Sequence, residues 1–238
     1  MKNFGGEGSK VTWASNWHSD RYVNQKGQRV SLGQYNEALE YVPQLWNVTF
    51  ATEFDHNMNT NMGLAKRGTN AATNVFAFNE PNQCGGGGTC MTNRTDVLVE
   101  SYKQTLQKYG KSARLGAPSV TNGADGISWL RGFMEKCSDC QIDFVQAHWY
   151  GAAGHFIPYM EQFHGNFTDN PIWLTEFAIE NAPEKEQMEF LKMAMDFMDK
   201  KDYIERYAFF MAKPLGDSRS LVNEDGSLTE IGRLYNSG

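Results

Sequence analysis

The sequence predicts an α/β fold: a single-domain (β/α)8 barrel of the TIM-barrel type that spans residues 1–238. Apolar strand-like segments alternate with amphipathic helix-like segments, without an internal repeat or a linker of distinct composition. The strand-like segments are apolar on both faces, which is typical of a parallel sheet covered by helices. A chain of 238 residues is also long enough to form such a barrel as one domain.

The first half of the chain predicts this barrel less clearly than the second. Strands are expected over residues 10–17, 41–46, 48–54 and 73–78, and the capping box Ser31-x-x-Gln34 predicts a helix from about residue 31. The second and third units, within residues 41–72, are expected to be irregular. The structural alternative is a doubly wound sheet, which needs a glycine-rich phosphate turn after the first strand. The turn at residues 16–20 has no glycine.

The second half of the chain has a regular rhythm. Thr95 starts a helix that Gly110 ends, and three further helices are marked by apolar residues at helical spacing over 127–134, 155–163 and 188–198. The expected strands cover residues 114–120, 143–150, 171–178 and 203–211, and the last helix covers 228–235.

Composition excludes some classes of partner. The chain has 22 basic and 28 acidic residues, a net charge of −6, and no basic run. This balance argues against nucleic acid or an anionic membrane as a partner. No apolar stretch reaches the ~20 residues that a membrane span needs. Because 13% of the residues are aromatic, a neutral ligand such as a sugar fits this chain better than an anionic one. The protein is expected to be a monomer.

Four cysteines form two close pairs, Cys84/Cys90 and Cys137/Cys140. Two short-loop disulfides of a secreted protein are the favoured interpretation, and a four-thiolate zinc site or a redox motif at Cys137/Cys140 are the alternatives. Three glycosylation sequons, at Asn47, Asn93 and Asn166, also favour secretion. The first residues contain no apolar signal region, so we expect either a cytosolic protein or one whose signal segment is absent from this sequence.

Two glutamates follow apolar strand segments. Glu80 ends one in Asn79-Glu80-Pro81, and Glu176 ends another in Leu174-Thr175-Glu176. The carboxyl ends of barrel strands meet at one face, so both carboxylates are expected there. A strand-end salt bridge would explain one such glutamate, but two of them indicate chemistry. Paired carboxylates are what glycoside hydrolysis needs, one as a proton donor and one as a nucleophile or base.

Several further motifs accompany the two glutamates along the chain. The ordered set is Tyr41-Val42-Pro43-Gln44-Leu45-Trp46, Asn79-Glu80-Pro81, the stretch 129–140, Val145-Gln146-Ala147-His148-Trp149-Tyr150-Gly151, Trp173-Leu174-Thr175-Glu176-Phe177-Ala178 and Glu205-Arg206-Tyr207-Ala208-Phe209-Phe210. Taken together, these motifs resemble glycoside hydrolase family 128 of clan A, the retaining endo-β-1,3-glucanases related to fungal alkali-sensitive-linkage proteins. Residues 47–68 depart from the family pattern, which leaves the chain-length preference open.

The resemblance implies a role for each matching residue. Glu80 is expected to be the general acid/base and Glu176 the nucleophile. Asn79 is expected to hydrogen-bond the sugar 2-hydroxyl, and Tyr150 or His148 to hydrogen-bond Glu176 or a sugar hydroxyl. Asn16, at the end of the first strand, is also expected to bind substrate.

Aromatic side chains are expected to form the sugar platform. Trp17, Trp46 and Trp149 lie at strand ends, where each could stack on a glucose ring, whereas Trp13, Trp129 and Trp173 are expected in the core. Trp173 is expected to point to the strand face opposite Glu176. Where clan A usually has a tryptophan on the last strand, this chain has Phe209, with Phe210 beside it.

The sequence therefore predicts a retaining endo-β-1,3-glucanase that acts on β-1,3-glucan without a cofactor. No metal is expected, because the five histidines show no metal-ligand spacing. Two alternatives stay open: a clan A hydrolase of another β-glucan or of mannan, and a glucan-binding cell-wall protein with little turnover.

Overall fold

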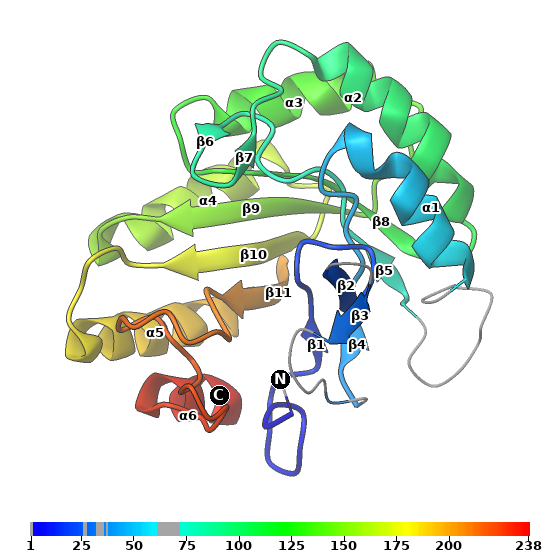
Figure 1. The fold of residues 1–238 in the computed structure, drawn as a ribbon. Helices are drawn as coiled ribbons and strands as arrows, with labels where there is room; N and C mark the ends of the chain where they lie inside the picture. Colours follow the sequence, from blue (N-terminus) through cyan, green and yellow to red (C-terminus); the bar gives the residue numbers. More distant parts are fainter. Residues whose placement is uncertain (1, 26–27, 32–35, 37, 61–71) are drawn as a thin grey trace.

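The computed structural model describes residues 2–25, 28–31, 36, 38–60 and 72–238. It is built around a parallel sheet that curls, with helices on its outer face (Figure 1). Five strands pair in the order β11-β10-β9-β8-β5. They are β5 (Asn74–Val75), β8 (Arg114–Val120), β9 (Phe144–Tyr150), β10 (Ile172–Ala178) and β11 (Ile204–Phe209).

Two further parallel strands, β1 (Trp13–Ala14) and β4 (Glu40–Tyr41), pair with each other. An isolated parallel bridge between Gln44 and Phe76 continues the sheet from the β4 segment to the β5 segment. Within the residues that the structure describes, no strand pairing joins β11 back to β1. The predicted α/β architecture with a parallel sheet is confirmed in this coarser form: a curled parallel sheet.

The inner side of the curled sheet is filled by a compact aromatic cluster. The ring centroids of Trp13 in β1 and Trp173 in β10 are 5.3 Å apart, and Phe144 of β9 stacks on Trp173 at 4.3 Å. The Phe76 ring meets all three of these rings edge-on. Two ion pairs also join strands that are not neighbours in the sheet. Glu40 of β4 pairs with Arg206 of β11, and Arg114 of β8 pairs with Glu205 of β11. These contacts cross the interior, so the sheet curls far enough for its two ends to share one core.

Helices cover the outer face, as the apolar periodicity of the second half predicts (Figure 1). The largest outer cluster packs apolar residues of β9 and β10 against α4 and α5. The helices are α1 (Ala51–Thr60), α2 (Thr95–Ser101), α3 (Gly126–Lys136), α4 (Phe156–Asn166), α5 (Glu184–Met198) and α6 (Glu230–Ser237). Short helical turns are η1 (Val48–Phe50), η2 (Tyr102–Leu106), η3 (Gln107–Tyr109) and η4 (Ala153–His155).

Two antiparallel hairpins are separate from the parallel sheet. One pairs β2 (Tyr22–Gln25) with β3 (Gln28–Ser31), and the other pairs β6 (Cys84–Gly85) with β7 (Gly88–Thr89). Both predicted disulfides, Cys84–Cys90 and Cys137–Cys140, are present. The strand expected at residues 48–54 is wrong, because this segment forms η1 and the start of α1. The helix predicted from Ser31 falls mostly outside the described residues, and Ser31 itself ends β3.

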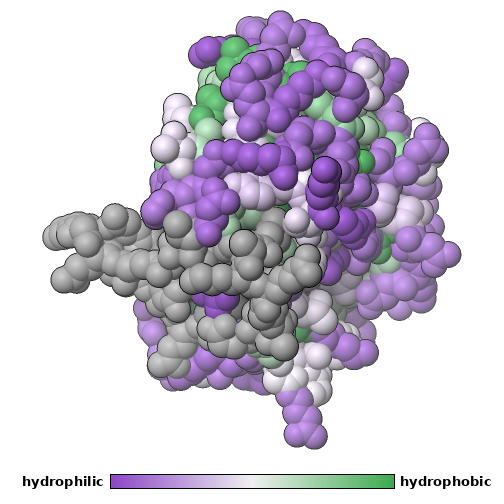
Figure 2. Space-filling view, turned by 90° about the vertical axis from the view of Figure 1, so that its right-hand side faces the viewer, coloured by the Kyte–Doolittle hydropathy of each residue, from purple (hydrophilic) through white to green (hydrophobic). Residues whose placement is uncertain are grey.

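The described surface is mainly polar, as the charged and polar composition of the chain leads one to expect. The face drawn in Figure 2 is mostly hydrophilic in its described part, with small apolar areas among the polar ones. None of the helices that the structure describes has the length and apolar character needed to span a bilayer.

Candidate active site

Glu80 stands at the carboxyl end of the β5 segment in an uncommon backbone conformation. Its φ is 42°, in the left-handed region that non-glycine residues seldom adopt. Its N–H donates to the Ser119 carbonyl at 2.9 Å, and its own carbonyl accepts from Gln83 at 3.0 Å. The residue is 5% exposed. The turn after the strand therefore holds a buried carboxylate at the carboxyl end of the parallel sheet.

Glu176 reaches the same place through an irregularity in β10. Leu174 is opposite Ala147 of β9 and Glu176 is opposite His148, so Thr175 is an extra residue, as in a β-bulge. Because of the bulge, Trp173 and Glu176 both face the inner side, although they are three residues apart. The sequence-based expectation that Trp173 points away from Glu176 is wrong for this reason, while its burial in the core is confirmed.

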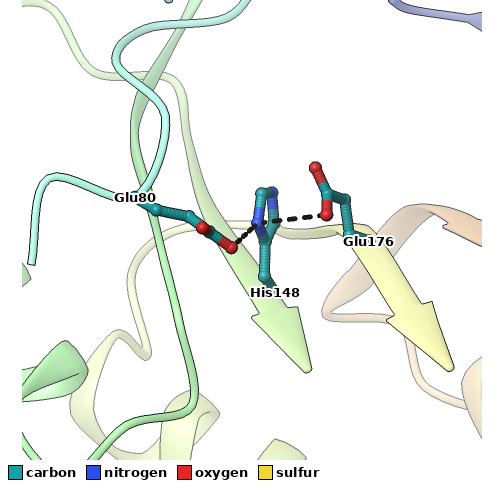
Figure 3. Close-up of side chains that lie close together, drawn as sticks. All are labelled: Glu80, His148 and Glu176. Atoms are coloured by element: carbon teal, nitrogen blue, oxygen red, sulfur yellow. Dashed lines mark hydrogen bonds and ion pairs between the residues drawn. The ribbon is translucent and has the colours of Figure 1, made fainter. Parts of the chain in front are cut away.

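His148 lies between the two carboxylates (Figure 3). Its Nδ1 is 2.7 Å from Oε1 of Glu80 and 3.7 Å from Oε2 of Glu176. One atom from each side chain, a ring nitrogen of His148 and a carboxylate oxygen of each glutamate, lies within 4.8 Å of the other two. Burial by itself lowers the pKa of His148, but the carboxylates of Glu176 and Glu80 outweigh it, so that this pKa lies above its usual value. The imidazole is thus biased toward its charged form.

Glu176 also accepts hydrogen bonds from two aromatic residues. The indole N–H of Trp17 donates to Oε1 and the hydroxyl of Tyr150 donates to Oε2, each at 2.7 Å. Burial and the negative charge of Glu176 raise the pKa of Tyr150 well above its usual range, so the phenol keeps its proton and acts as a donor. Two donors on two oxygens fix the carboxylate and stabilise its negative charge.

Asn79 lies beside Glu80 and is 4% exposed. Its Nδ2 donates to the Gly87 carbonyl at 3.2 Å, and its buried Oδ1 has no hydrogen-bond partner among the described residues. A buried amide oxygen without a partner costs free energy unless a ligand or water donates to it. Asn79 therefore presents a ready acceptor next to the carboxylate pair.

A cleft of about 610 Å³ opens above these side chains. Gly86 and Gly87, with φ of 59° and 100°, form one part of its wall in the tip of the β6–β7 hairpin, which the Cys84–Cys90 disulfide closes. The other lining residues are Trp17, Trp46, Asn79, Glu80, Gln83, Thr121, Asn122, Gly123, Tyr150, Glu176, Glu180, Phe210 and Arg219. Sequence reasoning missed Arg219, Glu180 and Asn122, because they lie in loops without a motif.

Two predicted platform residues are in the core instead. Trp149 is 1% exposed and packs against Phe156 of α4 and Phe190 of α5, because it alternates with His148 and Tyr150 along β9 and so faces the helices. Phe209 is 5% exposed and its ring meets Phe177 and Tyr235. The predictions that Trp149 and Phe209 are substrate platforms are therefore wrong.

On the last strand segment it is Phe210, not Phe209, that lines the cleft, where its ring meets Trp17 and Tyr150 edge-on. Trp46 also lines the cleft, where its stacking on a sugar ring stays a prediction.

Asn16 is used within its own loop. Its Oδ1 accepts from the Tyr41 hydroxyl and from the His18 N–H, and its Nδ2 donates to the Asp20 carbonyl at 3.2 Å. This loop holds Trp17 at a φ of 62°, which aims the indole at Glu176. Asn16 thus supports the loop that carries Trp17, and its predicted contact with substrate stays a prediction.

The trio of Glu80, His148 and Glu176 is also the one group of side chains in the described residues with the spacing of a metal site. Several of its ligand atoms already make hydrogen bonds, however. Both oxygens of Glu176 accept hydrogen bonds, and Nδ1 of His148 is paired with Glu80. This arrangement fits proton transfer and nucleophilic attack better than metal ligation.

Comparison with known proteins agrees with this geometry. Residues 1–235 match the family model described as the glycosyl hydrolase catalytic core. The chain belongs to this family. It is 31% identical over 235 residues to alkali-sensitive linkage protein 1 of Schizosaccharomyces pombe, covering 92% of this chain and 42% of the relative. The chain therefore spans less than half the length of that curated relative.

Solved structures of glycoside hydrolase family 128 have the same fold. One is the curdlan-specific exo-β-1,3-glucanase of Blastomyces gilchristii in complex with glucose, with a TM-score of 0.78, 28% identity, and coverage of 100% of this chain and 96% of that chain. Another is an endo-β-1,3-glucanase of Amycolatopsis mediterranei in complex with laminaripentaose, with a TM-score of 0.76, 23% identity, and coverage of 97% and 92%. The predicted membership of family 128 is confirmed.

Proposed function

We propose that this chain is a retaining β-1,3-glucanase that hydrolyses internal bonds of its substrate. The observation that carries the proposal is the carboxylate pair, since an oxygen of Glu80 and one of Glu176 lie within 4.8 Å of each other in an open cleft. Retaining glycosidases hold their carboxyl groups about 5–5.5 Å apart, whereas inverting enzymes need roughly 6.5–9.5 Å to admit a water. The laminari-oligosaccharide in a similar structure supports the substrate class.

In the first step, an oxygen of Glu176 attacks the anomeric carbon while the carboxylic acid of Glu80 gives its proton to the leaving glycosidic oxygen. The C–O bond to the leaving chain breaks and an ester to Glu176 forms. Trp17 and Tyr150 hold Glu176 in position for this attack. In the second step, Glu80 takes a proton from water, the water oxygen attacks the anomeric carbon, and Glu176 leaves as a carboxylate.

His148 links the two glutamates. Its raised pKa favours the charged imidazolium, which hydrogen-bonds Glu80 and lies 3.7 Å from Glu176. In that form His148 compensates the negative charge, which moves from Glu176 to Glu80 in the first step. The unpartnered Oδ1 of Asn79 accepts a hydrogen bond from the sugar 2-hydroxyl. Phe210 and Trp46 contact the apolar faces of glucose rings in the cleft.

The wider setting is proposed on the same basis. The chain is one catalytic domain whose described strands belong to an eight-unit barrel, and it works as a monomer without a cofactor. Its two disulfides support secretion to the extracellular space or cell wall.

Laminarin digestion tests the proposal. Wild type is expected to release a ladder of oligosaccharides and Glu80→Gln to release almost none, and NMR of the first product is expected to show the β-anomer. Release of glucose alone would mean an exo mode of cleavage, and an α-anomer would mean inversion. Tight laminarin binding by wild type without any release would instead favour a glucan-binding protein.

A further inference from the structure

A second hollow lies beside the catalytic cleft, and the mechanism above does not use it. It has a volume of about 240 Å³, and its walls include Trp17, Trp46, Phe50 and Glu53. Trp17 and Trp46 also line the catalytic cleft, so the two hollows share a wall. The second hollow is therefore adjacent to the cleft along the wall that Trp17 and Trp46 form.

The hollow has an aromatic corner that faces solvent. Phe50 is 38% exposed, and among the described residues the large hydrophobic side chains with this much exposure are Phe50 and Val97. The Phe50 ring meets Trp46 edge-on, with centroids 5.8 Å apart and planes at 79°. Val97 lines neither hollow. An exposed phenylalanine that extends an aromatic wall next to a catalytic cleft is typical of a binding surface.

Glu53 adds a polar group to this corner. It follows Phe50 by three residues in the first turn of α1, the spacing that puts two helical side chains on the same side. The residue is exposed, and its carboxylate makes no hydrogen bond or ion pair with another described residue. A carboxylate can accept hydrogen bonds from two sugar hydroxyls at once. The described lining contains no lysine or arginine, which fits a neutral ligand better than an anionic one.

We infer that this hollow is a further glucosyl-binding subsite, in which Phe50 and Trp46 contact one sugar ring away from the cleaved bond and Glu53 accepts its hydroxyl hydrogen bonds. The inference rests on the proposed function. It predicts that the enzyme gains affinity from substrate length beyond the sugars that the catalytic cleft holds.

The test compares Phe50→Ala, Phe50→Trp and Glu53→Gln with wild type on laminari-oligosaccharides of two to seven units. For Phe50→Ala, the loss of kcat/KM on the heptasaccharide is expected to exceed the loss on the shortest cleaved substrate by roughly fivefold to thirtyfold, because one or two kcal/mol of contact is removed. Phe50→Trp is expected to keep most of the wild-type kcat/KM on the heptasaccharide. Glu53→Gln is expected to lose less kcat/KM than Phe50→Ala, again mainly on the long substrates. Val97→Ala is the matched control, and its kcat/KM is expected to equal that of wild type at every substrate length.

Equal losses at every length would overturn the inference, because they would mean that Phe50 supports the fold of the site. Unchanged kinetics on the long substrates would overturn it as well. Failure of the proposed function has a different signature, since wild type itself would then cleave none of the oligosaccharides. In that case titration calorimetry of the heptasaccharide decides, and equal affinity of wild type and Phe50→Ala would reject the subsite.

Discussion

The two halves of the sheet are built differently, and the residues of the candidate active site are divided between them. In the second half, β8 to β11 are strands of six or seven residues. In the first half, β1, β4 and β5 have two residues each. Glu176, His148 and Tyr150 come from the regular half, whereas Trp17 and Glu80 come from the irregular half.

The difference teaches how each half aims its side chains. Trp17 and Glu80 both have positive φ, at 62° and 42°, so the irregular half departs from strand geometry at the residues that enter the site. The regular half keeps its strand geometry and uses the bulge at Thr175 to turn Glu176 inward. Long strands thus provide a rigid scaffold, and short strands free the backbone for strained turns at their ends.

The largest expected effect separates the two carboxylates, one from each half. Glu176→Gln should lower kcat on every substrate by more than about a thousandfold, because no ester can form. Glu80→Ala should lower activity on laminarin by roughly 10²–10⁴-fold, yet spare the first step with an activated aryl glucoside, whose leaving group needs no proton. Stopped-flow measurement of aryl release checks this.

Azide gives the control for this assignment. With Glu80→Ala it should restore turnover and give a β-glycosyl azide, since azide needs no base. With Glu176→Ala it should enter from the vacated face and give an α-glycosyl azide. The opposite anomers would exchange the roles of the two glutamates.

The next effect is on stability. Trp149→Ala should lower the free energy of unfolding by about 3–5 kcal/mol, because it leaves a cavity against α4 and α5. Trp46→Ala is the matched variant from the irregular half, and it should change stability by much less because its side chain lines the cleft. Urea unfolding measures both. Similar losses for the two variants would remove this contrast between the halves.

A smaller effect is expected for the two donors on Glu176. Tyr150→Phe and Trp17→Phe should each lower kcat/KM by about tenfold to a hundredfold, since each removes a hydrogen bond to a charged group. Tyr159→Phe is the control, because the buried Tyr159 hydroxyl has no partner in the described part of the chain. A Tyr159→Phe loss as large as that of Tyr150→Phe would indicate a general effect of removing a hydroxyl.

The smallest expected effect is the pH dependence of stability from His148. Its folded pKa is raised, so its stabilising contribution is complete below the unfolded value of about 6.5 and is lost as the pH rises through the folded pKa. Wild type should therefore lose stability relative to His148→Gln as the pH rises above neutrality, by at most about 1.4 kcal/mol per pH unit. Thermal unfolding across pH 5–9 checks this, and parallel curves would contradict the raised pKa.

Sequence alone determined the regular half well. The strands expected at residues 114–120, 143–150 and 171–178 and the helices between them follow from runs of buried residues and helical periodicity, which are local properties. The motif at Asn79-Glu80-Pro81 and the strand-end position of Glu176 were likewise enough to select the two carboxylates. The disulfide pairs followed from close cysteine spacing.

Only the tertiary structure decided which way several of these side chains face. A single extra residue at Thr175 reverses the expected relation between Trp173 and Glu176, and a sequence pattern of period two does not reveal a bulge. Trp149 lies near the end of β9 and Trp17 follows β1, yet Trp149 is buried by helices and Trp17 donates to Glu176, because strand register and loop conformation set the direction. Local sequence fixes which residues are available, but the contacts between distant strands decide which of them meet in the site.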